Sequence, residues 1–282
     1  MPELDVSRIS AEVARLCQQV NLEADPAVLE CLEREKRGKG ERARAFAADL
    51  LANAVAARED RVPICQDTGM VVVFLELGQD LHLTGGDLEE AVQAGVRKAY
   101  HEGYLRKSVV DDPLRRKNTG DNTPAVMHTR IVPGSKLRLT VAPKGFGSEN
   151  ASALAMLTPA QGREGVIKFV LATLREKGAN ACPPLVLGIG IGGTMEKAAL
   201  LAKEALTLPL GRAHPDPKYR ALEVEIVERA NRLGIGMQGL GEGTAVLAAH
   251  ILEFPTHIAG LPVAVNTCCH VYRHAEVVLE GK

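Results

Sequence analysis

Three segments of this sequence set a cysteine beside other reactive side chains. Cys65 begins the run CQDTG at 65–69, Cys182 lies in NACPP at 180–184, and Cys268 and Cys269 lie in NTCCH at 266–270. Each segment adjoins an apolar run that predicts a strand. A structural zinc site is closed by four ligands, and an iron–sulfur cluster usually has four cysteines. Three cysteines would leave one iron free to act as a Lewis acid. The residues alone leave this hypothesis open beside that of buried, unreactive cysteines.

Two glycine-rich segments could bring backbone close to another group. The run KGFGSEN at 144–150 has glycines whose neighbouring N–H groups could approach an anion. The run GIGIGG at 188–193 is superficially like a dinucleotide-binding loop, but the acidic residue expected about twenty positions later is missing. We therefore expect the backbone at 188–193 to pack closely around the hypothetical metal cluster, and we expect no nicotinamide cofactor.

The other two cysteines are predicted to be core residues. Cys17 and Cys31 fall among apolar neighbours on predicted helices, where a thiol behaves as a small hydrophobic group. The sequence has no C-x-x-C pair, which argues against a zinc ribbon and a thioredoxin-type motif.

The elements that must position these segments follow from hydrophobic periodicity. Apolar residues recur every three or four positions at 6–22, and further helices are predicted at 26–36 and 41–58, so residues 1–60 form a helical N-terminal part. Asp87, with Glu90 three positions later, should cap another helix. The remaining predicted strands are 70–77, 125–132, 136–141, 185–189, 245–252 and 263–266; the remaining helices are 87–103, 164–177, 194–206 and 218–233, with a last element at 271–279.

This order predicts a mixed α/β fold. The helical N-terminal part would pack on an irregular α/β body, because strands and helices do not alternate as in a regular Rossmann ladder. No linker-like or repetitive segment interrupts residues 1–282, so we expect one domain.

Composition excludes several functional classes. The formal net charge is −1 and the chain has no Trp, so neither a nucleic-acid partner nor an anionic membrane surface is expected. No apolar run approaches the roughly 18 residues of a transmembrane helix. The acidic, polar start is unlike a secretory signal, and we expect a cytoplasmic protein.

Taken together, seven segments resemble one family. They occur in order and resemble the α subunit of the two-subunit, class I fumarate hydratase and L-tartrate dehydratase family, and the resemblance covers the chain from about residue 40 to the C-terminus. The segments are CQDTG at 65–69, RKNTGDNTPAVMH at 116–128, KGFGSEN at 144–150, NACPP at 180–184, LGIGIGG at 187–193, GIGMQGLGEGT at 234–244 and NTCCHVYRHAE at 266–276. The resemblance implies a [4Fe–4S] cluster held by Cys65, Cys182 and Cys269, with Cys268 as the competitor for the third ligand.

The resemblance also implies roles for polar residues. Gln66 and Asp67 would contact substrate, and Asp67 would handle the proton of the hydroxyl; the alternative is a carboxylate that only caps the turn. Arg106 would bind a substrate carboxylate, with Lys107 as the competitor. Further implied roles are a backbone contact from Gly147, a histidine near the active site at His257 (the alternative being a core histidine), and loop ordering by residues 121–123.

The activity implied by the resemblance is a hydro-lyase reaction. We expect reversible hydration of fumarate to L-malate, with L(+)-tartrate dehydration as the alternative. From other classes, an iron–sulfur electron carrier or sensor and a zinc-dependent lyase remain as hypotheses. Because the sequence ends soon after the third cysteine segment, we also expect a separate β subunit that carries the remaining catalytic residues, in a dimer of αβ units.

Overall fold

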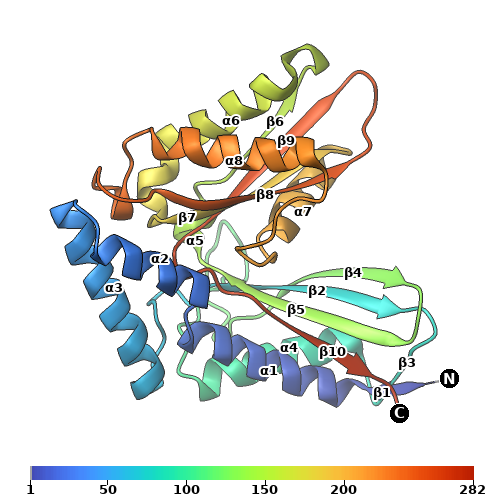
Figure 1. The fold of residues 1–282 in the computed structure, drawn as a ribbon. Coiled ribbons are helices and arrows are strands. Elements are labelled where there is room, and N and C mark those ends of the chain that lie inside the picture. The colour runs from blue at the N-terminus through green and yellow to red at the C-terminus, as the bar shows by residue number, and fades with distance from the viewer. Residues whose placement is uncertain (1) are drawn as a thin grey trace. The chain divides into compact units, whose positions relative to one another are not determined.

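The computed structural model describes residues 2–282, which form two compact units (Figure 1). The first unit contains the segment up to Ala24, Asn53–Gly145 and Arg273–Lys282; the second contains Asp25–Ala52 and Phe146–Tyr272. The three helices predicted within residues 1–60 are present, but they are shared between the two units. That residues 1–282 act as one domain stays a prediction.

A four-stranded sheet forms the centre of the first unit. Its order is β10-β5-β2-β4, where β2 (Met70–Gly78) is parallel to β4 (Val126–Val132) and antiparallel to β5 (Lys136–Lys144). The edge strand β10 (Ala275–Glu280) pairs antiparallel with β5. Alternation along β5 buries apolar side chains on the face that meets the helices, as a half-buried strand requires.

Two helices, α1 (Val6–Leu22) and α4 (Leu88–Glu102), pack against each other below this sheet in the view of Figure 1. Their close approach depends on Gly95, since a Cβ there would lie 2.6 Å from the backbone oxygen of Ser10. The predicted cap is confirmed, because the carboxylate of Asp87 accepts a hydrogen bond from the Glu90 N–H at 2.8 Å.

The second unit also has a four-stranded sheet, in the order β6-β9-β7-β8. The central strand β7 (Leu185–Gly192) is parallel to β8 (Val246–Phe254) and antiparallel to β9 (Leu261–Cys268), and β6 (Ala153–Leu157) pairs antiparallel with β9. Every residue of β7 is buried, which explains its continuous apolar sequence.

Helices cover both faces of this sheet. The helices α6 (Gly162–Lys177) and α8 (Pro217–Asn231) pack on one face, and α7 (Met195–Ala205) packs on the other (Figure 1). A Cβ at Gly188 would lie 2.1 Å from the oxygen of Ala202, and one at Gly190 would lie 2.0 Å from the oxygen of Ala198. The glycine run therefore serves close packing of α7 on β7.

The remaining elements are short or peripheral. They are β1 (Glu3–Asp5), β3 (His82–Thr84), α2 (Pro26–Lys36), α3 (Glu41–Asp60), α5 (Phe146–Glu149) and the 3-10 turns η1 (Pro159–Gln161), η2 (Gly178–Ala181) and η3 (Met237–Gly239).

The mixed α/β class without a regular Rossmann ladder is confirmed. The sequence prediction missed β1, β3 and β6, and it made β9 two residues too short at each end. None of the helices in residues 2–282 has the length and apolar character needed to cross a membrane.

Candidate active site

The turn at residues 65–69, which carries Cys65, lies in the first unit directly before β2. The residue ahead of it is fixed at both backbone groups: the Ile64 N–H donates to the Asn21 oxygen at 2.9 Å, and the Asn53 amide donates to the Ile64 oxygen at 2.9 Å. These contacts fix the path of the chain into the turn.

Interior donors hold the carbonyl groups of the turn. Arg273 Nη1 donates to the Asp67 oxygen at 2.7 Å, and the buried Tyr100 hydroxyl lies 2.7 Å from the Thr68 oxygen and 2.9 Å from the Gly69 oxygen. Because the backbone is held from the protein interior, the first three side chains of the turn remain accessible: Gln66 is exposed, and Cys65 and Asp67 are half-buried.

Asp67 caps the turn with one of its two carboxylate oxygens. Its Oδ1 accepts from the Gly69 N–H at 3.0 Å, as the turn-capping alternative requires. Its Oδ2 lies beside Gly145, where an added Cβ would sit 3.1 Å from both Asp67 Oδ2 and Arg273 Nη2. The second carboxylate oxygen is thus directed away from the capping bond, and Gly145 leaves room for it.

Arg106 is anchored to the same turn by its backbone. The Thr68 hydroxyl donates to the Arg106 oxygen at 2.9 Å, and the Ser108 N–H donates to Asn122 Oδ1 at 2.7 Å. Asn122, fully buried, also donates to the Gly69 oxygen at 3.1 Å. The Arg106 side chain is exposed, whereas Lys107 is half-buried. The structure therefore brings together Cys65, Gln66, Asp67 and Arg106, and Asn122 orders the loop as predicted.

The second unit brings Cys182 and Cys269 to one end of its sheet. Cys182 is exposed and ends η2 just before β7, while Cys269 follows β9, the antiparallel neighbour of β7. The Cys182 oxygen lies 3.4 Å from the His270 nitrogen and 3.2 Å from His270 Nδ1. Two of the three predicted cluster ligands, Cys182 and Cys269, are thus close together at this end of the sheet.

The neighbouring cysteines 268 and 269 differ in their surroundings. Cys268 is the last residue of β9, is 8% exposed, and packs in an apolar cluster that includes Val186, Met237 and Tyr272. Cys269 lies beyond the strand and is half-buried. This difference favours Cys269 as the ligand, and the assignment stays a prediction.

Gly147 lies in α5, which packs against the same end of β9. The Thr267 hydroxyl donates to the Ser148 oxygen at 2.5 Å, and the Asn266 amide donates to Glu149 Oε2 at 3.1 Å. Among the described residues, no atom lies within 4 Å of a Cβ added at Gly147. Its backbone is therefore accessible to a ligand at the end of the sheet that carries Cys182 and Cys269.

His257 lies at the other end of that sheet. It is exposed in the loop before β9, whereas Cys269 follows β9, and eight residues of strand extend about 26 Å. With Lys218 and Ile258 it lines a pocket of about 660 Å³. Within its unit, His257 is not beside the thiols, and its role in substrate binding stays a prediction.

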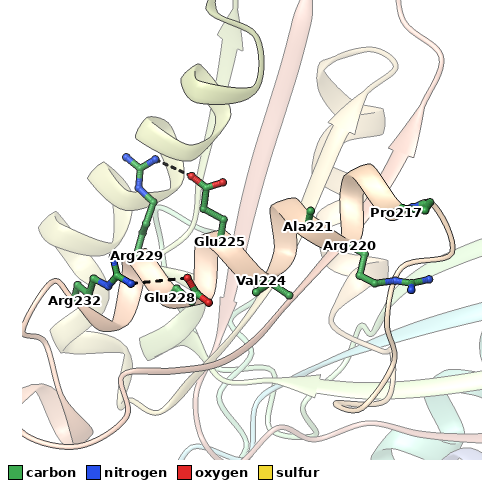
Figure 2. A pocket seen from close by; sticks show the side chains of 8 residues that line it. All are labelled: Pro217, Arg220, Ala221, Val224, Glu225, Glu228, Arg229 and Arg232. Carbon is green, nitrogen blue, oxygen red and sulfur yellow. Dashed lines mark hydrogen bonds and ion pairs between the residues drawn. The ribbon is translucent and has the colours of Figure 1, made fainter.

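A shallow groove of about 620 Å³ runs along the exposed face of α8. Figure 2 shows Arg229 pointing toward Glu225 and Arg232 toward Glu228. Arg229 also pairs with Glu164 of α6 at 3.1 Å, so these charges help to fix α8 on α6. No cysteine lines this groove, and we assign it to the scaffold.

The cysteines differ in their fitness as metal ligands. A thiol must ionise to bind a metal. Burial raises the pKa of the Cys17 thiol to about 12 and also raises the pKa of Cys31. Cys65, Cys182 and Cys269 are each at least partly accessible. Among residues 2–282, no three His, Cys, Asp or Glu side chains gather closely enough to hold a metal by themselves. The soft thiolates of Cys65, Cys182 and Cys269 would nevertheless suit an iron–sulfur cluster.

The sequence did not predict the supporting roles of Tyr100, Asn21 and Arg273. Asn21 and Arg273 stand 252 positions apart and are joined by a hydrogen bond of 2.8 Å. No local pattern in the sequence signals such a pair.

The chain is similar to known proteins over most of its length. A family model described as fumarate hydratase (fumerase) matches residues 10–278. The chain belongs to this family of hydro-lyases. A relative from Methanocaldococcus jannaschii, provisionally named L(+)-tartrate dehydratase subunit alpha, is 40% identical over 80% of this chain and 81% of its own length. The L(+)-tartrate dehydratase subunit alpha of Escherichia coli K12 is 35% identical over 78% of this chain and 75% of its own length.

Proposed function

We propose that this chain is the α subunit of an L(+)-tartrate dehydratase. The observation that carries the proposal is its 35% and 40% identity to relatives of that name over three quarters or more of their length. These names favour the tartrate alternative over fumarate hydration. Such a reaction removes hydroxide from one carbon and a proton from its neighbour, and the enol product converts to a keto acid.

Cys65, Cys182 and Cys269 are the proposed ligands of a [4Fe–4S] cluster. When bound, the cluster would supply a Lewis-acidic iron to a departing hydroxyl group. The resemblance of the segments CQDTG at 65–69, NACPP at 180–184 and NTCCH at 266–270 to those of the family supports this grouping.

The chain's own residues would bind and orient the substrate. The exposed guanidinium of Arg106 can form two parallel hydrogen bonds to one carboxylate, and the backbone of Gly147 can approach a carboxylate closely. The Gln66 amide can donate to a hydroxyl or carboxylate oxygen. Asp67 is the proposed acid–base group for the proton of the hydroxyl.

A β subunit is the proposed partner, because the relatives are named as alpha subunits. We propose that it supplies the group that removes the carbon-bound proton and that the assembly is a dimer of αβ units in the cytoplasm. Membership of a hydro-lyase family supports catalysis over the electron-carrier and sensor hypotheses.

Fumarate hydration is the second candidate, since the family model is described as fumarate hydratase. Both substrates are four-carbon dicarboxylates that differ in hydroxyl groups. A site that hydrogen-bonds a hydroxyl can reject an analogue lacking it by a large factor.

The test is anaerobic co-expression with the cognate β subunit, followed by assays with L(+)-tartrate, fumarate and L-malate. We expect a kcat/KM for tartrate at least tenfold above that for fumarate or malate, and little activity from the α chain alone. A preference for fumarate would replace the tartrate assignment, and full turnover by the isolated chain would reject the divided site.

A matched pair of variants tests the ligands. Cys269→Ser should lose iron, sulfide and activity together, whereas Cys268→Ser should keep them, because only Cys268 is packed in an apolar cluster. The reverse result would exchange the two assignments. Cys65→Ser should also lose the cluster, and retention of full iron and sulfide by that variant would reject it.

A further inference from the structure

Arg273 has two hydrogen-bond acceptors, and both are neutral. Its Nη1 donates to Asn21 Oδ1 at 2.8 Å and to the Asp67 backbone oxygen at 2.7 Å. The residue is 7% exposed, and none of the ion pairs among the described residues includes it. Arg273 is therefore a buried positive charge with no carboxylate in ion-pair contact.

Such a charge is costly to bury without a partner. If the only task were to satisfy the Asp67 oxygen, a neutral amide could perform it. The presence of a guanidinium here therefore points to a use for its positive charge. The nearby acidic group is Asp67, whose Oδ2 and Arg273 Nη2 each lie 3.1 Å from the position of a Cβ added at Gly145.

Asn21 holds Arg273 and the entrance of the turn at the same time. It is 1% exposed; its amide donates to the Cys17 oxygen at 2.8 Å, and its backbone oxygen accepts from Ile64 at 2.9 Å. Its Oδ1 fixes the guanidinium without neutralising it. One buried residue thus aligns the chain before Cys65 and the cation behind Asp67.

We propose that Arg273 is the positioning residue of the Cys65 turn. It would hold Asp67 in place and supply the fixed positive charge that balances the anionic groups at this turn. The proposal rests on the proposed function, in which that turn carries a cluster ligand and an acid–base group. A dicarboxylate substrate and thiolate ligands are negative, and a buried cation stabilises them with little screening by solvent. Asn21 is the residue that keeps this cation unpaired.

The test uses variants that separate charge from packing. Arg273→Gln removes the charge, and Arg273→Lys keeps it. Asn21→Asp replaces the amide that contacts the guanidinium with a carboxylate of similar size. Arg138→Gln is the control, because Arg138 is a half-exposed residue of the same unit with surface ion pairs. Each variant is measured for amide exchange at residues 65–69 without cluster, for cluster content and reduction potential after reconstitution, and for kcat and KM with the β subunit.

Removal of the charge should lower the reduction potential at unchanged cluster content, because net charge near a cluster sets its potential. In the αβ enzyme, Arg273→Gln should lower kcat about tenfold with a smaller change in KM, and Arg273→Lys should restore most of it. Asn21→Asp should lower the potential in the same direction while the chain stays folded. Amide exchange at residues 65–69 should accelerate in Arg273→Gln and stay unchanged in Arg138→Gln.

An Arg273→Gln variant with unchanged exchange, potential and kcat would overturn the proposal. So would an Asn21→Asp variant that folds and keeps the original potential and kcat. If the unaltered chain takes up no cluster, the proposed function fails separately, and amide exchange in the cluster-free chain still decides whether Arg273 positions the turn.

Discussion

Removal of one hydroxyl group, in Tyr100→Phe, should measurably destabilise the first unit. Tyr100 is 0% exposed, and its hydroxyl is the hydrogen-bond donor to the Thr68 oxygen. The Gly69 oxygen would keep the Asn122 amide at 3.1 Å, so one buried carbonyl loses its partner. An unsatisfied buried acceptor costs about 1–3 kcal/mol. We expect a loss of about 2 kcal/mol, and therefore a fall in Tm of about 4–8 °C.

The assay is denaturant and thermal unfolding of the full chain. Tyr104→Phe is the matched control, because Tyr104 is 91% exposed and should change the stability by less than about 0.5 kcal/mol. Amide exchange should accelerate at residues 65–69 in Tyr100→Phe alone. Equal stability of the two variants would refute the argument that the Tyr100 hydroxyl holds the turn.

Three further outcomes follow from the structure. Gly190→Ala should cost about 3 kcal/mol or more, because its Cβ would lie 2.0 Å from the Ala198 oxygen; Gly211→Ala, with open space around it, is the control. In the native, cluster-free chain at pH 8, iodoacetamide should label the exposed Cys182 at least tenfold faster than Cys17, whose pKa burial raises to about 12, and comparable rates would contradict this. Burial also raises the pKa of Tyr100, so the unfolded state, with a pKa of about 10, loses that proton first. The free energy of unfolding should therefore fall above about pH 10, less steeply in Tyr100→Phe.

Local pattern was enough to locate most of the secondary structure. The spacing of apolar residues in α1 and the cap at Asp87 depend on neighbours within four positions, and both were found correctly. The strand β6 was missed because Ala153–Leu157 has the sequence ALAML, which consists of good helix formers and contains no β-branched or aromatic residue.

The residues of the candidate site also fall into those that the sequence reveals and those that only the fold reveals. The side chains that would meet substrate, such as Gln66 and Asp67, lie in short runs that the sequence displays. Their supports come from distant elements: Tyr100 from α4, Asn21 from α1 and Arg273 from the segment before β10. Such pairings depend on the tertiary fold. The sequence alone likewise did not decide between tartrate and fumarate, and the tartrate proposal rests on the names of the relatives.

The first unit is built from separate segments of the chain, and the ribosome synthesises them at different times. The Cys65 turn is synthesised early, but Arg273 and β10 follow only after the segment Phe146–Tyr272. At about 5–20 residues per second, the ribosome needs roughly 6–25 s to add that segment. A nascent chain therefore exposes Cys65 without its final hydrogen bonds throughout this interval. The turn therefore gains its hydrogen bond from Arg273 only after the third segment of the first unit has been synthesised.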